Sequence, residues 1–226
     1  HRPLDIKDSM HHVVSLERGH LYGPFPAGQI RTPNHIGSPP HLVADHRPGA
    51  GQATSVTPAS IRLSLDQVSV ITSGRRILGP VSWTLRAGEH WLIQGPNGSG
   101  KTTLLKLLAA EMHPSRGRLT RYPPLDSRTL QGLRQRYGYF SPDLLTVHHR
   151  SQTGLQTVLS GLRGQLGHRE EFTCAEEEKA LIWLQSLEIK DLADKDIMTM
   201  STGQLRRVLL ARTLVHNPKL LLIDEP

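Results

Sequence analysis

The stretch Gly95-Pro96-Asn97-Gly98-Ser99-Gly100-Lys101-Thr102-Thr103 decides the fold of this 226-residue chain. It fits the phosphate-binding pattern G-x-x-x-x-G-K-[ST] at every fixed position. Glycine has no Cβ atom, so the backbone can curl here and direct several N–H groups at phosphate oxygens. In this pattern the lysine, Lys101, reaches the β- and γ-phosphates, and the hydroxyl of Thr102 binds Mg²⁺.

The residues on either side of the loop supply the setting that it requires. Residues 90–94 form a short apolar run typical of a buried strand, and residues 103–110 are mostly strong helix formers. A helix that begins here turns the positive end of its dipole toward the phosphates. Strand, glycine loop and helix together predict a nucleotide-binding α/β fold rather than a glycine-rich turn that binds nothing.

Composition narrows the remaining classes of function. The 27 basic residues exceed the 20 acidic residues, which gives a net charge of +7. Such a balance suits nucleic acid or an anionic membrane surface, but ordinary surface charge with a nucleotide pocket explains it better. The aromatic content of 4% counts against a platform for single-stranded nucleic acid. Cys174 is the only cysteine, which excludes an intrachain disulfide and a cysteine-based zinc site. No apolar run approaches the length of a membrane span, and no secretory signal is recognised.

Residues 1–60 differ from the rest of the chain. They hold 8 of the 16 prolines and 7 of the 13 histidines, with no apolar periodicity. The histidine spacings match no metal-binding pattern. We therefore expect this segment to be disordered, or not to belong to the mature protein, and we expect a single ordered domain over residues 61–226.

Within that domain, alternating apolar and polar residues predict strands at 61–70, 77–85, 117–120 and 137–140. The pattern becomes helical from about 143 to 200, where Ala180, Leu181, Leu184 and Leu187 share one helix face. A further helix is predicted over 203–216, ended by the Asn217-Pro218 pair. The apolar run 220–223 predicts a parallel strand that is buried on both faces.

This last strand places Asp224 and Glu225 at its C-terminal end, where open α/β sheets hold their ligands. Asp224 is suited to bind Mg²⁺, directly or through water, and Glu225 is suited to polarise an attacking water as a general base. The alternative is that both carboxylates are solvated charges at a strand end. The phosphate-binding loop upstream favours the functional interpretation.

A third motif, Met200-Ser201-Thr202-Gly203-Gln204, precedes the same strand. At this point the chain resembles the ATP-binding-cassette (ABC) family, whose signature is Leu-Ser-Gly-Gly-Gln. Ser201, Gly203 and Gln204 match this signature, whereas Met200 and Thr202 depart from it. A serine hydroxyl and a glycine amide at a helix N-terminus can contact a γ-phosphate. The alternative is that Ser201 only caps the helix.

The resemblance covers residues 61–226 and implies a fold and a set of ligands. The implied fold is an α/β P-loop NTPase of the ABC type, with an antiparallel β subdomain and a helical subdomain at about 143–200. The implied ligands are ATP, held by residues 95–103, and Mg²⁺, held by Thr102 and Asp224, with Glu225 as the catalytic residue. Residues 138–141 and 207–212 look most like the molybdate-type, ModF-like branch.

The resemblance also implies partners and a location. Ser201, Thr202, Gly203 and Gln204 would act in trans on the ATP of a second cassette, in a homodimer or a tandem protein. A membrane permease is a further implied partner, and nucleic acid is not expected. The implied location is cytoplasmic, peripheral to the inner face of the membrane.

Three positions depart from the family pattern. Thr72 stands where the family has an aromatic residue that stacks on adenine, which predicts weaker or less selective base binding. Pro142 stands where the family has a glutamine near the permease, which counts against coupled transport. The sequence stops at Pro226, before the family's D-loop and switch histidine, so we expect an incomplete cassette.

Three functions remain as hypotheses. The first is an ATPase that drives an ABC-type transport or mechanical cycle through a nucleotide-sandwich dimer. The second is a soluble ABC ATPase that acts on ribosomes or nucleic acid, supported by six arginines against one acid, Asp126, in residues 116–136. The third is a remnant that binds nucleotide without turnover. For the chain as given, the third predicts weak ATP binding and negligible hydrolysis.

Overall fold

The computed structural model describes residues 12–26, 61–121, 137–141, 151–163 and 171–224. The chain divides into two compact units. The first consists of His1–Leu107 and Met112–Asp126, and the second of Leu108–Glu111 and Ser127–Pro226. The strand before the phosphate-binding loop and the loop itself belong to the first unit, whereas Asp224 and Ser201 belong to the second.

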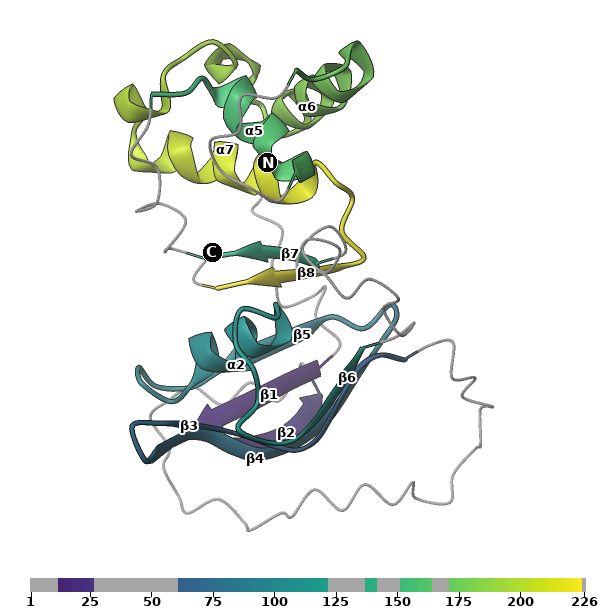
Figure 1. Ribbon diagram of the computed structural model, residues 1–226, viewed down its shortest axis with the longest axis vertical. Helices are drawn as coiled ribbons and strands as arrows, with labels where there is room; N and C mark the ends of the chain where they lie inside the picture. The colour runs from purple at the N-terminus through teal and green to yellow at the C-terminus, as the bar shows by residue number, and fades with distance from the viewer. Residues whose placement is uncertain (1–11, 27–60, 122–136, 142–150, 164–170, 225–226) are drawn as a thin grey trace. The chain divides into compact units, whose positions relative to one another are not determined.

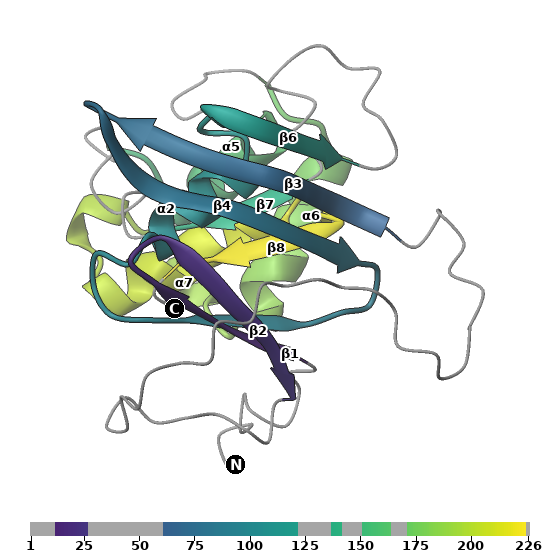
Figure 2. The same ribbon diagram turned by 90° about the horizontal axis from the view of Figure 1, so that it is seen from below.

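An antiparallel sheet forms one part of the first unit. It contains β3 (Ile61–Thr72), β4 (Arg75–Arg86) and β6 (Arg116–Arg121) in the order β4-β3-β6, and these strands lie side by side in Figure 2. Leu63, Leu65, Val68 and Val70 of β3 are buried. Leu63 and Leu65 follow the predicted alternation, and after a register shift between Leu65 and Val68 the alternation resumes at Val68 and Val70. This sheet is the expected antiparallel β subdomain.

A second sheet in this unit contains β5 (Trp91–Gln94), the strand before the phosphate-binding loop. Its neighbour is β1 (His12–Glu17), which pairs in parallel with β5 and antiparallel with β2 (His20–Pro26). The expected disorder of residues 1–60 is therefore wrong for residues 12–26. The prediction failed because the composition of the whole segment is dominated by residues typical of loops. The apolar residues Val14 and Leu16 of the hairpin are buried, and their strand pairs with β5, which is far away in sequence.

Helix α2 (Lys101–Leu108) begins directly at the end of the glycine loop. Leu104, Leu107 and Leu108 are fully buried or nearly so, which fixes the helix to the apolar interior. The predicted helix is confirmed, although it ends two residues earlier than expected. Ala110 has a φ of +64°, a left-handed conformation that cannot continue an α-helix.

The strand pair of the second unit carries the acidic motif. β7 (Tyr137–Phe140) pairs in parallel with β8 (Leu220–Ile223), from Tyr137 opposite Leu220 to Phe140 opposite Ile223. The expected burial of β8 on both faces is wrong, because Leu222 is 6% exposed while Leu221 and Ile223 are 37% and 39% exposed. Within the described residues β8 has one neighbouring strand, which leaves its other edge uncovered.

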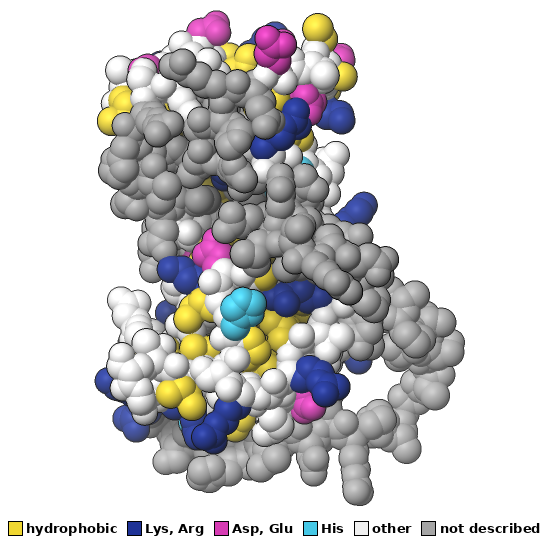
Figure 3. Space-filling view, in the orientation of Figure 1, with side chains coloured by type: hydrophobic (Ala, Val, Ile, Leu, Met, Phe, Trp, Pro, Cys, Tyr) yellow, Lys and Arg dark blue, Asp and Glu magenta, His cyan; other side chains and the backbone are white. Residues whose placement is uncertain are grey.

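Among the described residues of the second unit, three α-helices gather together in Figure 1. They are α5 (Gly154–Arg163), α6 (Cys174–Ser186) and α7 (Thr202–Leu214), with short 3-10 turns at Lys190–Leu192 and Ile197–Thr199. Val158, Ala180, Leu184 and Val208 are completely buried in their common core. Figure 3 shows acidic and basic side chains among hydrophobic and other side chains on the visible face of these helices. The helical subdomain predicted at about 143–200 is described over 151–163 and 171–200. The predicted apolar face of α6 packs on this core through the buried Ala180 and Leu184, with Leu181 and Leu187 partly buried.

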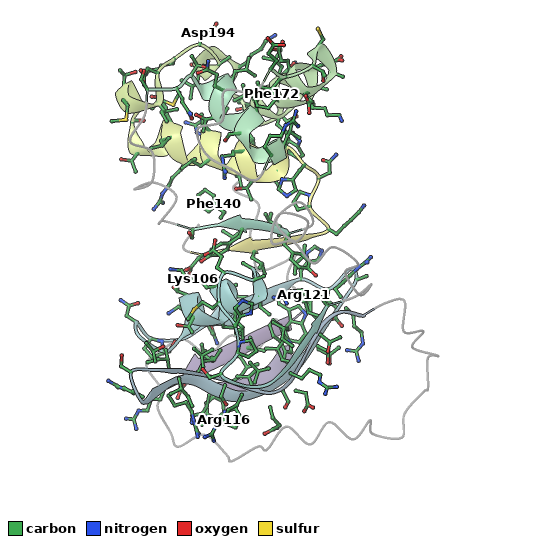
Figure 4. All side chains as sticks on the ribbon, in the orientation of Figure 1. Lys106, Arg116, Arg121, Phe140, Phe172 and Asp194 are labelled. Carbon is green, nitrogen blue, oxygen red and sulfur yellow. The ribbon has the colours of Figure 1, made fainter. Side chains whose placement is uncertain are left out.

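An ion pair joins α5 to α6. The guanidinium of Arg163 donates from Nη1 and Nη2 to the carboxylate of Glu176, at 2.5 and 3.2 Å, and it also lies 5.2 Å from the ring centre of Phe172 (Figure 4). Thr173 caps α6, and its backbone N–H donates to the same carboxylate. These hydrogen bonds lower the pKa of Glu176 from 4.5 to about 2. The bond from the Arg163 side chain has the largest effect, and the bond from the Thr173 backbone has the next largest.

We predict that this pair stabilises the fold at neutral pH and not in acid. Because the folded pKa of Glu176 lies below its ordinary value of 4.5, its contribution is complete above that pH and disappears as the pH falls toward 2. Urea denaturation should show Glu176→Gln less stable than wild type at pH 7. The difference in the free energy of unfolding should shrink as the pH falls from 4.5 to about 2. Glu177→Gln, which removes an exposed charge from the next position, is the control. Equal, pH-independent losses in both variants would contradict the assignment.

Candidate functional site

The glycine loop has a backbone that only glycine adopts without strain. Gly95, Gly98 and Gly100 have φ values of +154°, +76° and +105°. At Gly95 a Cβ atom would lie 2.0 Å from the carbonyl oxygen of Leu16, a distance that no side chain tolerates. Gly98 has open space around it and is exposed. The loop is therefore closed on the side of Gly95 and open at Gly98.

The N-terminus of α2 presents unused hydrogen-bond donors at this loop. The first intrahelical bond runs from the N–H of Leu104 to the carbonyl oxygen of Gly100, at 2.8 Å. The N–H groups of residues 101–103 precede that bond and have no acceptor within the helix. Together with the positive end of the helix dipole, they form an anion site of the kind that the sequence predicts.

Lys101 closes the loop with its side chain. Its Nζ donates to the carbonyl oxygens of Gly95 and Pro96, at 2.8 and 3.0 Å. An ammonium group has three donors, so one remains for a further acceptor. The side chain is half-buried, which places the charge at the mouth of the loop. This position fits the role expected of the lysine in a phosphate-binding loop.

Ser99 provides an independent observation on what the loop accommodates. It is 2% exposed, and its hydroxyl has no hydrogen-bond partner among the residues that the structure describes. Its backbone N–H donates to the carbonyl oxygen of Pro96 at 3.2 Å, which fixes the turn. A buried hydroxyl without a partner is costly, so the loop holds a polar group that an oxygen-rich ligand can satisfy. The residues present therefore fit a polyphosphate.

The two candidate Mg²⁺ ligands lie in different units. Thr102 is exposed in the first turn of α2, and Asp224 follows β8 and is 5% exposed. The backbone N–H of Asp224 donates to the carbonyl oxygen of Phe140 at 2.9 Å, which fixes the residue at the end of its strand. A hydroxyl and a carboxylate are the oxygen ligands that Mg²⁺ prefers. Glu225 and Pro142 lie outside the described residues.

The motif at 201–204 forms the start of α7. The Ser201 hydroxyl accepts from the N–H of Gln204 at 3.3 Å, and Oε1 of Gln204 accepts from the N–H of Ser201 at 3.1 Å. This is a capping box, so the capping alternative for Ser201 is confirmed as geometry. A capping hydroxyl only accepts, and its own hydrogen remains available to a ligand. Capping and phosphate contact are therefore compatible in the same residue.

Gly203 has no packing reason for lacking a side chain. A Cβ atom at this position would meet no heavy atom within 4 Å among the described residues, and Ser201, Thr202 and Gly203 are all exposed. The start of α7 is therefore open to solvent. A glycine with empty space around it is consistent with a surface that another molecule approaches closely.

Sequence reasoning missed one part of the site, namely the wall that the β1–β2 hairpin forms against the glycine loop. Leu16 contacts both Gly95 and Gly100, and the hairpin turn at Gly19 bonds to Ser99. The motif itself gave no signal for this wall, because the hairpin is far away in sequence. The pair Arg18-Gly19 between two short apolar stretches is a typical hairpin turn and is the signal that could have located it.

No described helix has the length and apolar character that crossing a bilayer demands. Likewise, no grouping of three or more histidine, cysteine, aspartate or glutamate residues suited to a metal ion occurs in the described segments. The arginine-rich stretch 116–136 is described only as far as Arg121, whose Nη2 donates to the carbonyl oxygen of Leu107 at 3.0 Å.

Comparisons with known proteins agree with this geometry. Residues 78–226 match the family described as "ABC transporter". The ABC transporter ATP-binding protein ModF of Escherichia coli (strain K12) is 35% identical over 170 residues, covering 73% of this chain and 34% of ModF. The uncharacterized ABC transporter ATP-binding protein C323.04 of Schizosaccharomyces pombe is 28% identical over 238 residues, covering 100% of this chain and 46% of that protein.

Among solved structures, cbiO1 of Clostridium perfringens, described as part of the ABC transporter complex cbiONQ, has a TM-score of 0.60 and 29% identity. That likeness covers 74% of this chain and 66% of cbiO1. The chain spans about a third to a half of the length of the two curated relatives above. The match over residues 78–226, with the loop and the order of strands and helices, means that the chain belongs to the ABC transporter family.

Proposed function

We propose that this protein binds MgATP through residues 95–103 and that the full-length protein hydrolyses ATP to drive an ABC-type transport or mechanical cycle. The observation that carries the proposal is the glycine loop itself. Unused N–H groups at the start of α2, the Lys101 ammonium and the buried hydroxyl of Ser99 all meet there. The names of the relatives, which are ATP-binding proteins of ABC transporters, support the same ligand.

Each residue has a defined part in this proposal. Lys101 exchanges its bonds with Gly95 and Pro96 for bonds with the β- and γ-phosphates. Thr102 and Asp224 would hold Mg²⁺, which would neutralise phosphate charge. Glu225 acts as the general base that polarises the attacking water. A hydrogen bond between the Lys101 ammonium and a phosphate oxygen is charge-assisted, and such bonds are about twice as strong as neutral ones.

A second cassette completes the proposed cycle. The exposed N-terminus of α7 offers the free hydrogen of the Ser201 hydroxyl and the N–H groups of Thr202 and Gly203 to the ATP held by that partner. The partner is a second copy or a tandem cassette, and a permease at the inner face of a membrane is the further partner in a transport cycle. The family match favours transport over action on nucleic acid.

The first prediction concerns the grip on phosphate. Lys101→Met should weaken MgATP binding by on the order of tenfold or more, because a charge-assisted bond to phosphate is worth about 1.5–3 kcal/mol. Lys106→Met removes the same charge from the same helix, away from the loop, and should bind within about twofold of wild type. Isothermal titration calorimetry measures both. Equal losses of MgATP affinity in the two variants would contradict a specific role of Lys101 and would indicate that only the net charge of the protein affects binding.

The second prediction concerns the metal. Wild type should bind ATP more tightly with Mg²⁺ than with excess EDTA, because a bound Mg²⁺ would neutralise phosphate charge. Asp224→Asn keeps the shape of the buried side chain and removes its charge, so it should lose most of this difference. The ratio of the two affinities is measured for each protein, which cancels any general loss of binding. An unchanged ratio in the variant would remove Asp224 from the metal site.

The third prediction separates structure from function at Gly203. Within the described part of the chain, the Cβ of an alanine at this position would have no heavy atom of another element within 4 Å, and alanine is favoured over glycine in helices by about 0.5–1 kcal/mol. Gly203→Ala should therefore not lower the melting temperature. In the full-length protein the same variant should lose ATP-dependent dimerisation, measured by analytical ultracentrifugation, while a single cassette still binds ATP. A variant that is stable and still dimerises with ATP would exclude this surface from the nucleotide sandwich.

A further inference from the structure

The connection between α6 and α7 carries a lysine that contacts the start of α7. Nζ of Lys195 donates to Oε1 of Gln204 at 3.1 Å. The same oxygen accepts from the backbone N–H of Ser201, also at 3.1 Å. A hydrogen bond with a charged donor is about twice as strong as a neutral one. The lysine ammonium is therefore a strong partner of the side chain that completes the capping box.

The backbone of Lys195 is held at the start of α5. Its carbonyl oxygen accepts from the N–H of Gly154 at 3.0 Å, and its N–H donates to the carbonyl oxygen of Leu192 at 3.2 Å. Leu192 is buried, and a Cβ atom on Gly154 would overlap its carbonyl oxygen, so the two segments pack closely. Lys195 therefore reaches Gln204 from a backbone position that hydrogen bonds fix.

The charge of Lys195 lies where a helix favours the opposite sign. The N-terminus of an α-helix carries a partial positive charge, so anions are stabilised there and cations at the C-terminus. Lys195 bonds to the neutral amide oxygen of Gln204, which does not neutralise the ammonium. The carboxylate of the next residue, Asp196, accepts instead from the Ser151 hydroxyl and the Met198 N–H. Two positive groups therefore lie together at the exposed start of α7, an arrangement that an anion would stabilise.

We propose that Lys195 is a positioning residue for the end of α7 that contacts phosphate. Its bond keeps the Gln204 side chain in the capping box, and the capping box keeps the Ser201 hydroxyl accepting from the Gln204 N–H. In that arrangement the hydroxyl hydrogen of Ser201 stays available to the ATP of the partner cassette. The charge of Lys195 adds to the positive end of the helix that meets this ATP. The proposal rests on the proposed nucleotide sandwich.

Hydrogen exchange without nucleotide tests the positioning itself. The amides of Ser201 and Gln204 bond within the capping box, so they should exchange faster in Lys195→Met than in wild type. Lys190→Met removes the same charge from the same connection, at an exposed position in the 3-10 turn Lys190–Leu192, and should leave both rates unchanged. Unchanged exchange of these amides in Lys195→Met would overturn the proposal.

ATP-dependent dimerisation of the full-length protein tests the consequence. Lys195→Met should associate on the order of tenfold more weakly than Lys190→Met, measured by analytical ultracentrifugation, while a single cassette binds ATP with unchanged affinity. Lys195→Arg keeps the charge and the donors, so it should retain most of the wild-type association. Equal association of Lys195→Met and Lys190→Met would overturn the proposal. A wild type that forms no dimer with ATP would overturn only the proposed sandwich, because the exchange measurement does not depend on ATP.

Gln204→Glu separates the stability of α7 from its contact with phosphate. A glutamate can form the same capping box and would pair with the ammonium of Lys195, so the melting temperature should not fall. The pair would neutralise the ammonium, so ATP-dependent dimerisation should weaken on the order of tenfold relative to wild type. A variant with wild-type stability and wild-type dimerisation would overturn the proposed contribution of the Lys195 charge.

Discussion

The close approach of the Leu16 carbonyl oxygen to Gly95 is the constraint on which the candidate site depends. A Cβ atom at Gly95 would lie 2.0 Å from that oxygen, so the loop can take this path only as glycine. The path brings Gly95 and Pro96 within reach of Lys101 and starts α2 with its N–H groups directed into the loop. Backbone packing therefore brings the lysine charge, the N–H donors and the helix dipole together at the loop.

Most of this site could be predicted from the sequence, because its motifs are local. The loop, its lysine and the cap at Ser201 each follow from residues within one turn of each other, and the structure places them accordingly. The hairpin at residues 12–26 could not be predicted in the same way. Its pairing with β5 joins residues that are far apart in sequence, and the prolines and histidines around it dominate the local composition. The exposure of Leu221 and Ile223 was missed because an apolar run does not reveal how many neighbours its strand has.

The proposed site offers different groups to the phosphates and to the base of a nucleotide. Thr72 is an exposed residue at the end of β3 and pairs with Arg75 across the turn. It offers no aromatic face to a base, whereas the loop concentrates a lysine, several N–H groups and the end of a helix on the phosphates. The binding free energy of the proposed site therefore comes mainly from the phosphate chain, with a small contribution from the base.

Competition for a bound fluorescent ATP analogue tests this central claim most directly. In the presence of Mg²⁺, tripolyphosphate and GTP should displace the analogue from the wild-type protein at concentrations similar to those of ATP, and adenosine should not displace it. This result follows if the loop at residues 95–103 holds the phosphates and Thr72 adds little to base recognition. Displacement by adenosine, with none by tripolyphosphate, would contradict the account.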